Sequence, residues 1–154
     1  MNSREKAAVF MATGFCVGNI PFAPGTFGSL IGLPISFLLA EIQLSAAIIA
    51  ALFIIGLSVW VSNVAERALK SKDPGCIVVD EMAGMIVSLI GLPFNLTTVL
   101  CGFIFFRILD ILKPFPIRII DKRVSGGVGV VADDVVAGIF ANLLLRIMFY
   151  FFYR

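Results

Sequence analysis

Five acidic side chains are the clearest candidates for chemistry in this sequence. Of its ten aspartates and glutamates, the candidates are Asp80, Glu81, Asp110, Asp133 and Asp134. A carboxylate at or within the edge of a membrane is costly and usually faces a polar cavity in which it functions. An adjacent pair at the start of a helix could instead cap that helix and interact with its dipole. Three such clusters, all in motifs that contain glycine, favour the functional interpretation.

The residue types that are absent narrow the chemistry further. The chain has no histidine, which excludes a Ser-His-Asp triad, an HExxH zinc site and a histidine general base. It has three cysteines without paired spacing, so neither a disulfide framework nor a zinc knuckle is indicated. Oxygen ligands alone favour a hard cation, Mg²⁺ above all, with Mn²⁺ as a substitute. The chemistry that such a site predicts is phosphoryl transfer or hydrolysis.

Basic side chains that suit a phosphate lie close to one of the acids. Arg107, Asp110 and Lys113 follow one another at intervals of three, so they share one face of a helix end just before Pro114. Arg107 and Lys113 could neutralise phosphate oxygens while Asp110 holds the metal. An ion pair at a helix end with a snorkelling lysine fits the same spacing equally well. The segment from Cys101 to Arg107 also matches the C-x5-R pattern of cysteine phosphatases, but its bulky apolar residues argue against a thiolate mechanism.

Two glycine-containing segments could offer backbone N–H groups to an anion. Residues 21–29, PFAPGTFGS, lead into an apolar helix, which would place Thr26, Gly28 and Ser29 at a helix N-terminus. The second segment, GGVG at 126–129, precedes the aspartate pair at 133 and 134. Neither matches the P-loop pattern, so each is weak evidence by itself.

The elements that must hold these side chains are strongly apolar. Hydrophobic residues make up 60% of the 154-residue chain and charged residues 14%, whereas soluble domains average about 45–50% and about 25%. The length predicts a single domain over residues 1–154. The segments without charge suffice for about four or five crossings of roughly 20 residues each. We therefore expect an all-α, polytopic bundle of membrane helices, which excludes a coiled coil, a disordered region and a nucleic-acid module.

Prolines and charges set the expected order of these helices. Residues 7–18 are expected to form a short interfacial or re-entrant helix, which Pro21 and Pro24 end. The further helices are expected over 29–40, 44–63, 82–92, 97–112 and 133–152, with a turn at 93–95 and a loop over 118–132. Most basic residues fall between 66 and 134 at one end of these helices, which the positive-inside rule places in the cytoplasm.

Small residues recur at helical spacing after each acidic pair, a pattern that lets membrane helices pack closely. They are Ala83, Gly84, Ser88 and Gly91 in the first case and Ala137, Gly138, Ala141 and Asn142 in the second. Another uncharged face, with Gly56, Ser58 and Ser62, could contact the rest of the chain or a second copy in a homo-oligomer.

Three blocks of the sequence resemble the bacterial phosphatidylglycerophosphatase A family. They are PFAPGTFGSL at 21–30, VVDEMAG at 78–84, and GFIFFRILDILKPFPIRIID at 102–121 continued by GGVGVVADDVVAG at 126–138. The resemblance covers nearly the whole chain. It implies a Mg²⁺-dependent enzyme of the bacterial inner membrane that hydrolyses phosphatidylglycerophosphate to phosphatidylglycerol and inorganic phosphate at the cytoplasmic face.

The resemblance also implies which residues form the site. The catalytic and metal-binding acids would be Asp80, Glu81, Asp110, Asp133 and Asp134. For the substrate phosphate we expect contacts with Arg107, Lys113, Thr26, Gly28 and Ser29.

Two other functions stay open at this point. A Mg²⁺-dependent phosphatidyl-alcohol transferase also binds its metal through membrane aspartates, although its DG-x-x-AR signature does not occur here. A small transporter or channel would use the same acids as an ion path. The net charge of +2 is too small to indicate a nucleic-acid partner.

Overall fold

Apolar segments of the sequence form the helices, and prolines, glycines and charged residues form most of the connections. The computed structural model describes residues 1–152, and this part of the chain contains seven α-helices and no β-strand. In chain order the helices are α1 (Ser3–Ala12), α2 (Pro24–Ala40), α3 (Leu44–Leu69), α4 (Val79–Leu89), α5 (Leu96–Leu112), α6 (Ile117–Arg123) and α7 (Gly127–Phe152), with a short 3₁₀ turn, η1, at Val17–Asn19. The predicted all-α fold is confirmed for the described residues.

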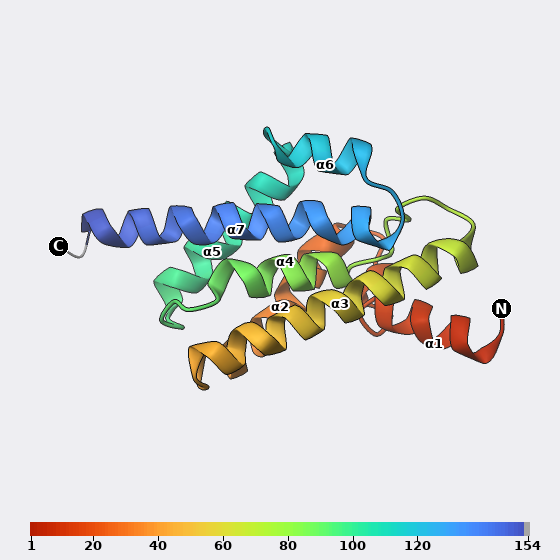
Figure 1. Cartoon of the computed structure of the whole chain (residues 1–154), viewed down its shortest axis with the longest axis horizontal. Helices are drawn as coiled ribbons and strands as arrows, with labels where there is room; N and C mark the ends of the chain where they lie inside the picture. Colours follow the sequence, from red (N-terminus) through yellow and green to blue (C-terminus); the bar gives the residue numbers. More distant parts are fainter. Residues whose placement is uncertain (153–154) are drawn as a thin grey trace.

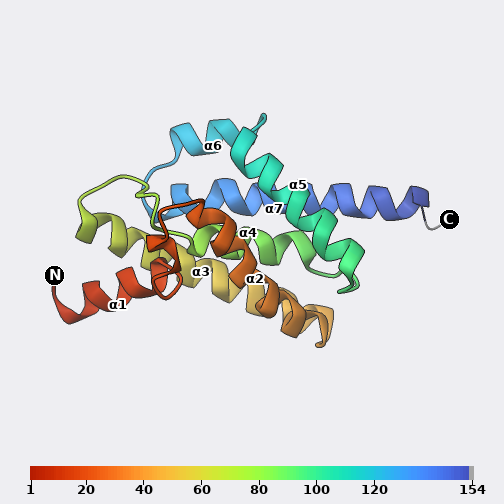
Figure 2. The ribbon, with the colours of Figure 1, turned by 180° about the vertical axis from the view of Figure 1, so that it is seen from behind.

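The short helix α4 lies at the centre of the bundle. It packs against α2, α3, α5 and α7, and most of its residues are buried. The two longest helices, α3 and α7, run along α4 in opposite directions, and α2 and α5 cover its other side (Figures 1 and 2). Helix α1 packs on α3 and α6 packs on α7, both at the end of the bundle where α7 begins (Figure 1).

Glycines bring α4 and α7 into backbone contact. A Cβ atom on Gly138 would lie 2.4 Å from the carbonyl oxygen of Gly84, and one on Gly84 would lie 2.7 Å from the carbonyl oxygen of Asp134. Real Cβ atoms do not approach other atoms this closely, so only glycine fits at either position. The strips of small residues therefore act as packing surfaces, as their spacing predicts. Gly91 is the exception, because α4 ends at Leu89 and Gly91 lies beyond it with a φ of 68°.

A side-chain cap on the end of α4 adds to this contact. The Asn142 side-chain amide, on α7, donates hydrogen bonds to the carbonyl oxygens of Val87, Ser88 and Ile90, at 3.3, 3.0 and 2.9 Å. The last carbonyl groups of a helix have no partner within the helix itself. Asn142 supplies these partners from a neighbouring helix, which lets α4 end inside the bundle.

The prediction of a loop over 118–132 is wrong. Residues 117–123 form α6, and α7 begins at Gly127, so that Asp133 lies nearly two turns inside the helix. The glycines in this segment serve close packing, because a Cβ on Gly127 would lie 2.1 Å from the carbonyl oxygen of Val59 on α3. Helix α3 is also longer than the expected 44–63: it continues through the charged residues Glu66 and Arg67 and ends at Leu69.

The N-terminal helix begins and ends earlier than expected. Asn2 and Glu5 form a capping box that starts α1 at Ser3, and the positive φ of Gly14 lies just beyond its end. The face of α3 that could have served a homo-oligomer is divided: Ser58 and Ser62 are buried within the chain, whereas a Cβ on Gly56 would meet nothing within 4 Å.

Two helices are long and apolar enough to cross a membrane. Helices α3 and α7 have 26 residues each, and only 22% of the most apolar window of each is buried inside the protein. The core helix of a soluble protein would be mostly buried. Helix α2 is apolar but shorter, at 17 residues. The outward faces of these helices therefore present large apolar side chains, such as Leu52, Phe53 and Leu143.

Candidate active site

Three carboxylates from two helices meet beside the centre of the bundle. Asp80 and Glu81 lie in the first turn of α4, and Asp134 projects from α7. One oxygen of each lies within 4.8 Å of the others. Asp80 and Asp134 are almost fully buried, with 7% and 3% of their surface exposed. We refer to Asp80, Glu81 and Asp134 as the acidic triad.

The acidic triad lacks the partners that buried carboxylates need. Oδ1 of Asp80, Oε2 of Glu81 and Oδ2 of Asp134 are buried without a hydrogen-bond partner among residues 1–152. Burying a charge without compensation is strongly unfavourable. Burial, together with the charges of Glu81 and Asp134, raises the pKa of Asp80 well above its ordinary value, and burial also raises the pKa of Glu81. A bound cation would supply the missing partner and favour the ionised forms, so the triad could hold a metal.

Helix capping does not account for these acids. The residue that caps α4 is Val78, and no side chain donates or accepts a capping hydrogen bond there. Asp133 and Asp134 lie within α7, away from its N-terminus. Neither pair therefore caps its helix, although Asp80 and Glu81, in the first turn of α4, still lie where the helix dipole favours negative charge.

Arg107 and Asp110 form an ion pair beside the acidic triad. Both side chains line the same cavity as the triad, which has a volume of about 240 Å³. Nη1 of Arg107 lies 2.6 Å from Oδ2 of Asp110 and 3.5 Å from the hydroxyl of Ser29. Nε of Arg107 is buried without a partner. Arg107 therefore keeps donor capacity within the cavity.

Lys113 links the cavity to a neighbouring cluster. Its ammonium group lies 2.7 Å from Oδ1 of Asp121 and 2.5 Å from Oδ2 of Asp133. Burial alone would lower the pKa of Lys113, but the hydrogen bonds to Asp121 and Asp133 outweigh that effect and raise it. Lys113 is thus a permanent cation at neutral pH, while Oδ1 of Asp133 remains without a partner.

The N-terminus of α2 closes another side of the cavity. A Cβ atom on Gly25 would lie 2.1 Å from Oε1 of Glu81 and 3.2 Å from Nη1 of Arg107. No other residue type could stand at position 25 without displacing these two groups. Gly25 is therefore a part of the site that spacing alone did not single out.

Comparison with known proteins shows the family to which the chain belongs. The phosphatidylglycerophosphatase A family matches residues 10–149. The chain belongs to this family. It is 38% identical over 136 residues to phosphatidylglycerophosphatase A of Escherichia coli strain K12, covering 88% of this chain and 79% of that protein. It is 35% identical over 139 residues to phosphatidylglycerophosphatase A of Haemophilus influenzae, covering 88% and 84%.

A further relative has a different name. A protein of Bacteroides thetaiotaomicron, provisionally named phosphatidylinositol-3-phosphatase, is 38% identical over 149 residues, covering 90% of this chain and 91% of its own. No solved structure matches the chain significantly. The predicted family and enzyme class are confirmed: the chain is a lipid phosphatase of phosphatidylglycerol biosynthesis, a phosphoric monoester hydrolase. Family membership favours hydrolysis over the transferase and transporter alternatives.

One cavity brings together all five predicted acids. Asp80, Glu81, Asp110, Asp133 and Asp134 line one cavity, together with Arg107 and Lys113. Within it, however, the acids divide into distinct groups: the triad, Asp110 paired with Arg107, and Asp133 paired with Lys113.

Three of the five predicted phosphate contacts do not line this cavity. They are Thr26, Gly28 and Ser29. A Cβ on Gly28 would lie 2.7 Å from Cβ of Val78, so its small size serves the contact between α2 and α4. Ser29 is fully buried, and its hydroxyl donates to the carbonyl oxygen of Gly25 at 2.8 Å. The geometry thus gives Ser29 a supporting contact to Arg107 and Gly25.

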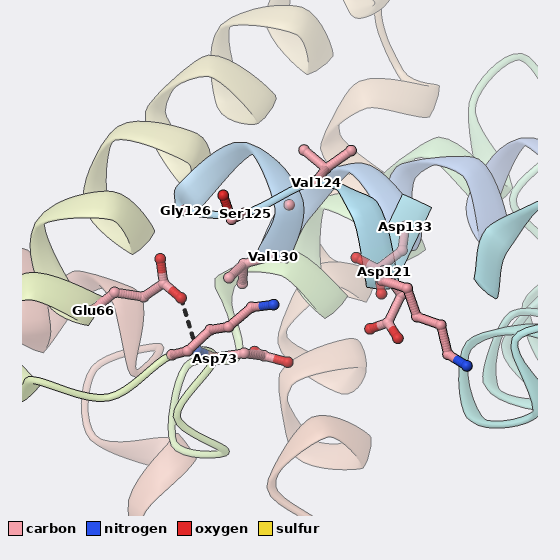
Figure 3. A pocket seen from close by; sticks show the side chains of 11 residues that line it. Glu66, Asp73, Asp121, Val124, Ser125, Gly126, Val130 and Asp133 are labelled. Atoms are coloured by element: carbon pink, nitrogen blue, oxygen red, sulfur yellow. Dashed lines mark hydrogen bonds between the residues drawn. The ribbon is translucent and has the colours of Figure 1, made fainter. Parts of the chain in front are cut away.

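A second, larger cavity adjoins the first and contains acids that sequence reasoning missed. It has a volume of about 420 Å³ and shares Asp73 and Asp133 with the first cavity. Figure 3 shows Asp121 beside Asp133, and Glu66 across the cavity accepting a hydrogen bond from the backbone N–H of Asp73 at 2.7 Å. Only the folding of α6 back onto α7 brings Asp121 here, so local spacing carried no signal for it.

Proposed function

We propose that this chain uses Mg²⁺ to hydrolyse phosphatidylglycerophosphate to phosphatidylglycerol and inorganic phosphate, at the cytoplasmic face of a bacterial inner membrane. The single observation that carries the cofactor assignment is the acidic triad, whose buried oxygens have no partner among the described residues. Family membership carries the reaction and the substrate. The name of the Bacteroides relative is the reason to test the headgroup directly.

The donor set fits a magnesium ion. The three carboxylates offer oxygen ligands only, and hard cations such as Mg²⁺ prefer one or two carboxylates together with waters and substrate phosphates. Asp80, Glu81 and Asp134 would hold the ion. When bound, the ion would supply charge stabilisation to the phosphoryl group during hydrolysis. Asp110 is already neutralised by Arg107 at 2.6 Å, so it orients that arginine.

Arg107 and Asp133 have separate roles in the hydrolysis of the phosphoryl group. Arg107 has an unused buried donor at Nε and neutralises a phosphate oxygen, as guanidinium groups do in phosphoryl transfer. Asp133 is held by Lys113 through Oδ2, which leaves Oδ1 without a partner in the cavity. We assign Asp133 Oδ1 as the acceptor of the proton from the attacking water. The water oxygen forms a new bond to phosphorus as the bond from phosphorus to the glycerol oxygen breaks. The proton accepted by Asp133 then passes to the glycerol oxygen, which yields phosphatidylglycerol and inorganic phosphate.

The membrane placement follows from where the apolar and charged surfaces lie. Helices α3 and α7 are the two spans that length and composition support. Helices α2 and α5 run beside them and also expose large apolar side chains, among them Leu38 and Ile104, which gives four membrane helices, and α1 would lie at the interface. The charged residues of α1, α6 and the segment after α3 lie at the end of the bundle that holds the acidic triad (Figure 1). The excess of basic residues there favours the cytoplasmic side.

The test is phosphate release by the purified protein in detergent. The substrates are phosphatidylglycerophosphate, phosphatidylinositol 3-phosphate and phosphatidic acid, each with Mg²⁺ and with excess chelator. We expect release from the first substrate only with Mg²⁺, and a loss of at least about 100-fold in Asp80→Asn. Glu41→Gln is the matched control, because Glu41 is an exposed acid in the turn between α2 and α3. Full activity in chelator, or in Asp80→Asn, would contradict the proposed metal site.

A further inference from the structure

A groove with a different charge from the active site runs along the junction of α5 and α6. It has a volume of about 480 Å³, and half of the residues that line it are basic: Lys113, Arg118, Lys122 and Arg123. The others are apolar, and none of its lining residues is acidic. The two cavities at the active site, by contrast, are lined by several carboxylates each. The groove is therefore the one of these three cavities that suits an anion without needing a metal.

The groove opens next to the active site. Lys113 lines both the groove and the cavity of the acidic triad. Its ammonium group has three N–H donors and donates to Asp121 and Asp133, which leaves one donor. A molecule bound in the groove thus lies one side chain away from the site at which a phosphate would react.

The rim of the groove is apolar and faces outward. Phe115 and Leu112 are among the most exposed large apolar residues in the chain, with 81% and 72% of their surface exposed. Ile108 and Ile111 are also exposed one turn earlier on α5, so an apolar strip continues from the groove along the helix. Basic groups beside such a strip are typical of surfaces that lie at the boundary between lipid headgroups and acyl chains.

We propose that this groove binds the phosphodiester of the lipid substrate, with the acyl chains lying along the exposed strip of α5. The proposal rests on the proposed function and extends it to headgroup recognition. Phosphatidylglycerophosphate has a terminal phosphomonoester and, across one glycerol unit, a phosphodiester that joins the diacylglycerol. The monoester belongs in the cavity of the acidic triad, where a cation offsets the carboxylates. The diester has no cation of its own and requires basic side chains, and of these three cavities only the groove is lined by basic residues without acidic ones.

The charges that line the cavities beside the active site determine on which side the lipid lies. The 420 Å³ cavity also adjoins the active site, but its acids, Glu66, Asp73, Asp121 and Asp133, outnumber its two lysines, Lys72 and Lys122. The excess of negative charge there would repel a phosphodiester. Arginine recognises phosphate through paired N–H donors, and Arg118 and Arg123 are exposed and available for such contacts. The lipid therefore enters from the side of α5 and α6, and the acidic cavity is left for water.

The experiment uses Arg118→Gln and Arg123→Gln, with Arg67→Gln as the control. Arg67 is an exposed arginine in the last turn of α3 and lies outside the groove. All three substitutions remove one charge from an exposed position, so the fold is not at risk. Two quantities are measured in detergent: the binding of short-chain phosphatidylglycerol, which has the diester but no monoester, and the kinetics with phosphatidylglycerophosphate.

We expect each groove variant to weaken binding of phosphatidylglycerol and to raise KM, each by roughly tenfold. That factor corresponds to the lower end of the energy range for a hydrogen bond to a charged group. The kcat value and inhibition by inorganic phosphate should stay at the wild-type level, since phosphate binds at the triad. Arg67→Gln should change none of these. Wild-type phosphatidylglycerol binding in both groove variants would overturn the proposal. An inactive wild-type protein that still binds phosphatidylglycerol through Arg118 would refute the proposed function but not the binding of a phosphodiester in the groove.

Discussion

Replacing Asp134 by asparagine separates a metal-binding role from a structural one. The substitution keeps the size of the side chain and removes one negative charge from the acidic triad. An oxygen of Asp134 lies within 4.8 Å of oxygens of Asp80 and Glu81. Two unit charges at that separation repel each other by about 3.5 kcal/mol at an effective dielectric constant of about 20. Partial protonation of the triad reduces this repulsion, so we expect Asp134→Asn to raise the free energy of unfolding by about 1–3 kcal/mol without divalent cations.

Magnesium should reverse the order of stability of the wild-type protein and Asp134→Asn. A ligand at 100 times its dissociation constant stabilises the folded protein by about 2.7 kcal/mol, and the wild-type triad retains all three ligands to receive it. Asp134→Asn lacks one charged ligand and should gain little. For a chain of this size, 1 kcal/mol shifts the melting temperature by roughly 2–4 °C. The variant should therefore melt several degrees above wild type in chelator, while the gap closes or inverts in Mg²⁺.

The assay is thermal unfolding in detergent, followed by circular dichroism, in chelator and at increasing Mg²⁺. Phosphate release is measured on the same preparations and should be lost in Asp134→Asn under all conditions. Glu41→Gln should behave like wild type in both measurements. If Asp134→Asn melts below wild type in chelator, the carboxylate stabilises the fold through contacts of its own. The inference of an electrostatically strained, metal-binding triad would then be refuted.

Other substitutions test three glycines and the Asn142 side chain that caps the end of α4. Gly25→Ala should reduce kcat/KM by tenfold or more with little change in melting temperature, because the added methyl displaces the mobile end of Glu81, 2.1 Å away. Gly56→Ala, with nothing within 4 Å, should keep full activity and gain up to about 1 kcal/mol from helix propensity. Gly84→Ala should destabilise the protein by about 1–3 kcal/mol, since its Cβ meets backbone and a buried ring. Asn142→Leu should cost a similar amount by removing its hydrogen bonds to three carbonyl groups, of which only that of Ile90 keeps another donor, Arg146, and chemical denaturation measures both.

Several helix ends could be predicted because side chains at those positions determine them locally. Helix α2 ends at Ala40 and α5 ends at Leu112, both as expected. Asn95 starts α5 by accepting a hydrogen bond from the backbone N–H of Thr98, at the turn predicted from Pro93 onward. The acidic residues also came together as expected, since hydrophobicity and the rarity of charge single out their positions.

The start of α7 could not be predicted from local sequence. Glycine is a poor helix former, so a run with Gly127 and Gly129 indicates a loop when read alone. In the structure their Cβ atoms would meet the carbonyl oxygens of Val59 and Val124, at 2.1 and 2.4 Å. Glycine is thus required by a neighbouring helix and by the preceding segment, and tertiary packing overrides propensity. Asp121 was missed for a related reason, because α6 reaches Lys113 only after the chain turns back.

The strips of small residues and the acidic pairs belong to one arrangement. Gly84 follows Asp80 by four residues and Gly138 follows Asp134 by four, so each glycine lies one helical turn from a carboxylate. The backbones of α4 and α7 touch at these two glycines. Short aspartate side chains on separate helices can share one cation only where the helices approach this closely. Close packing would therefore let the carboxylates act together in the proposed metal site, which would account for an acidic pair at the start of each strip of small residues.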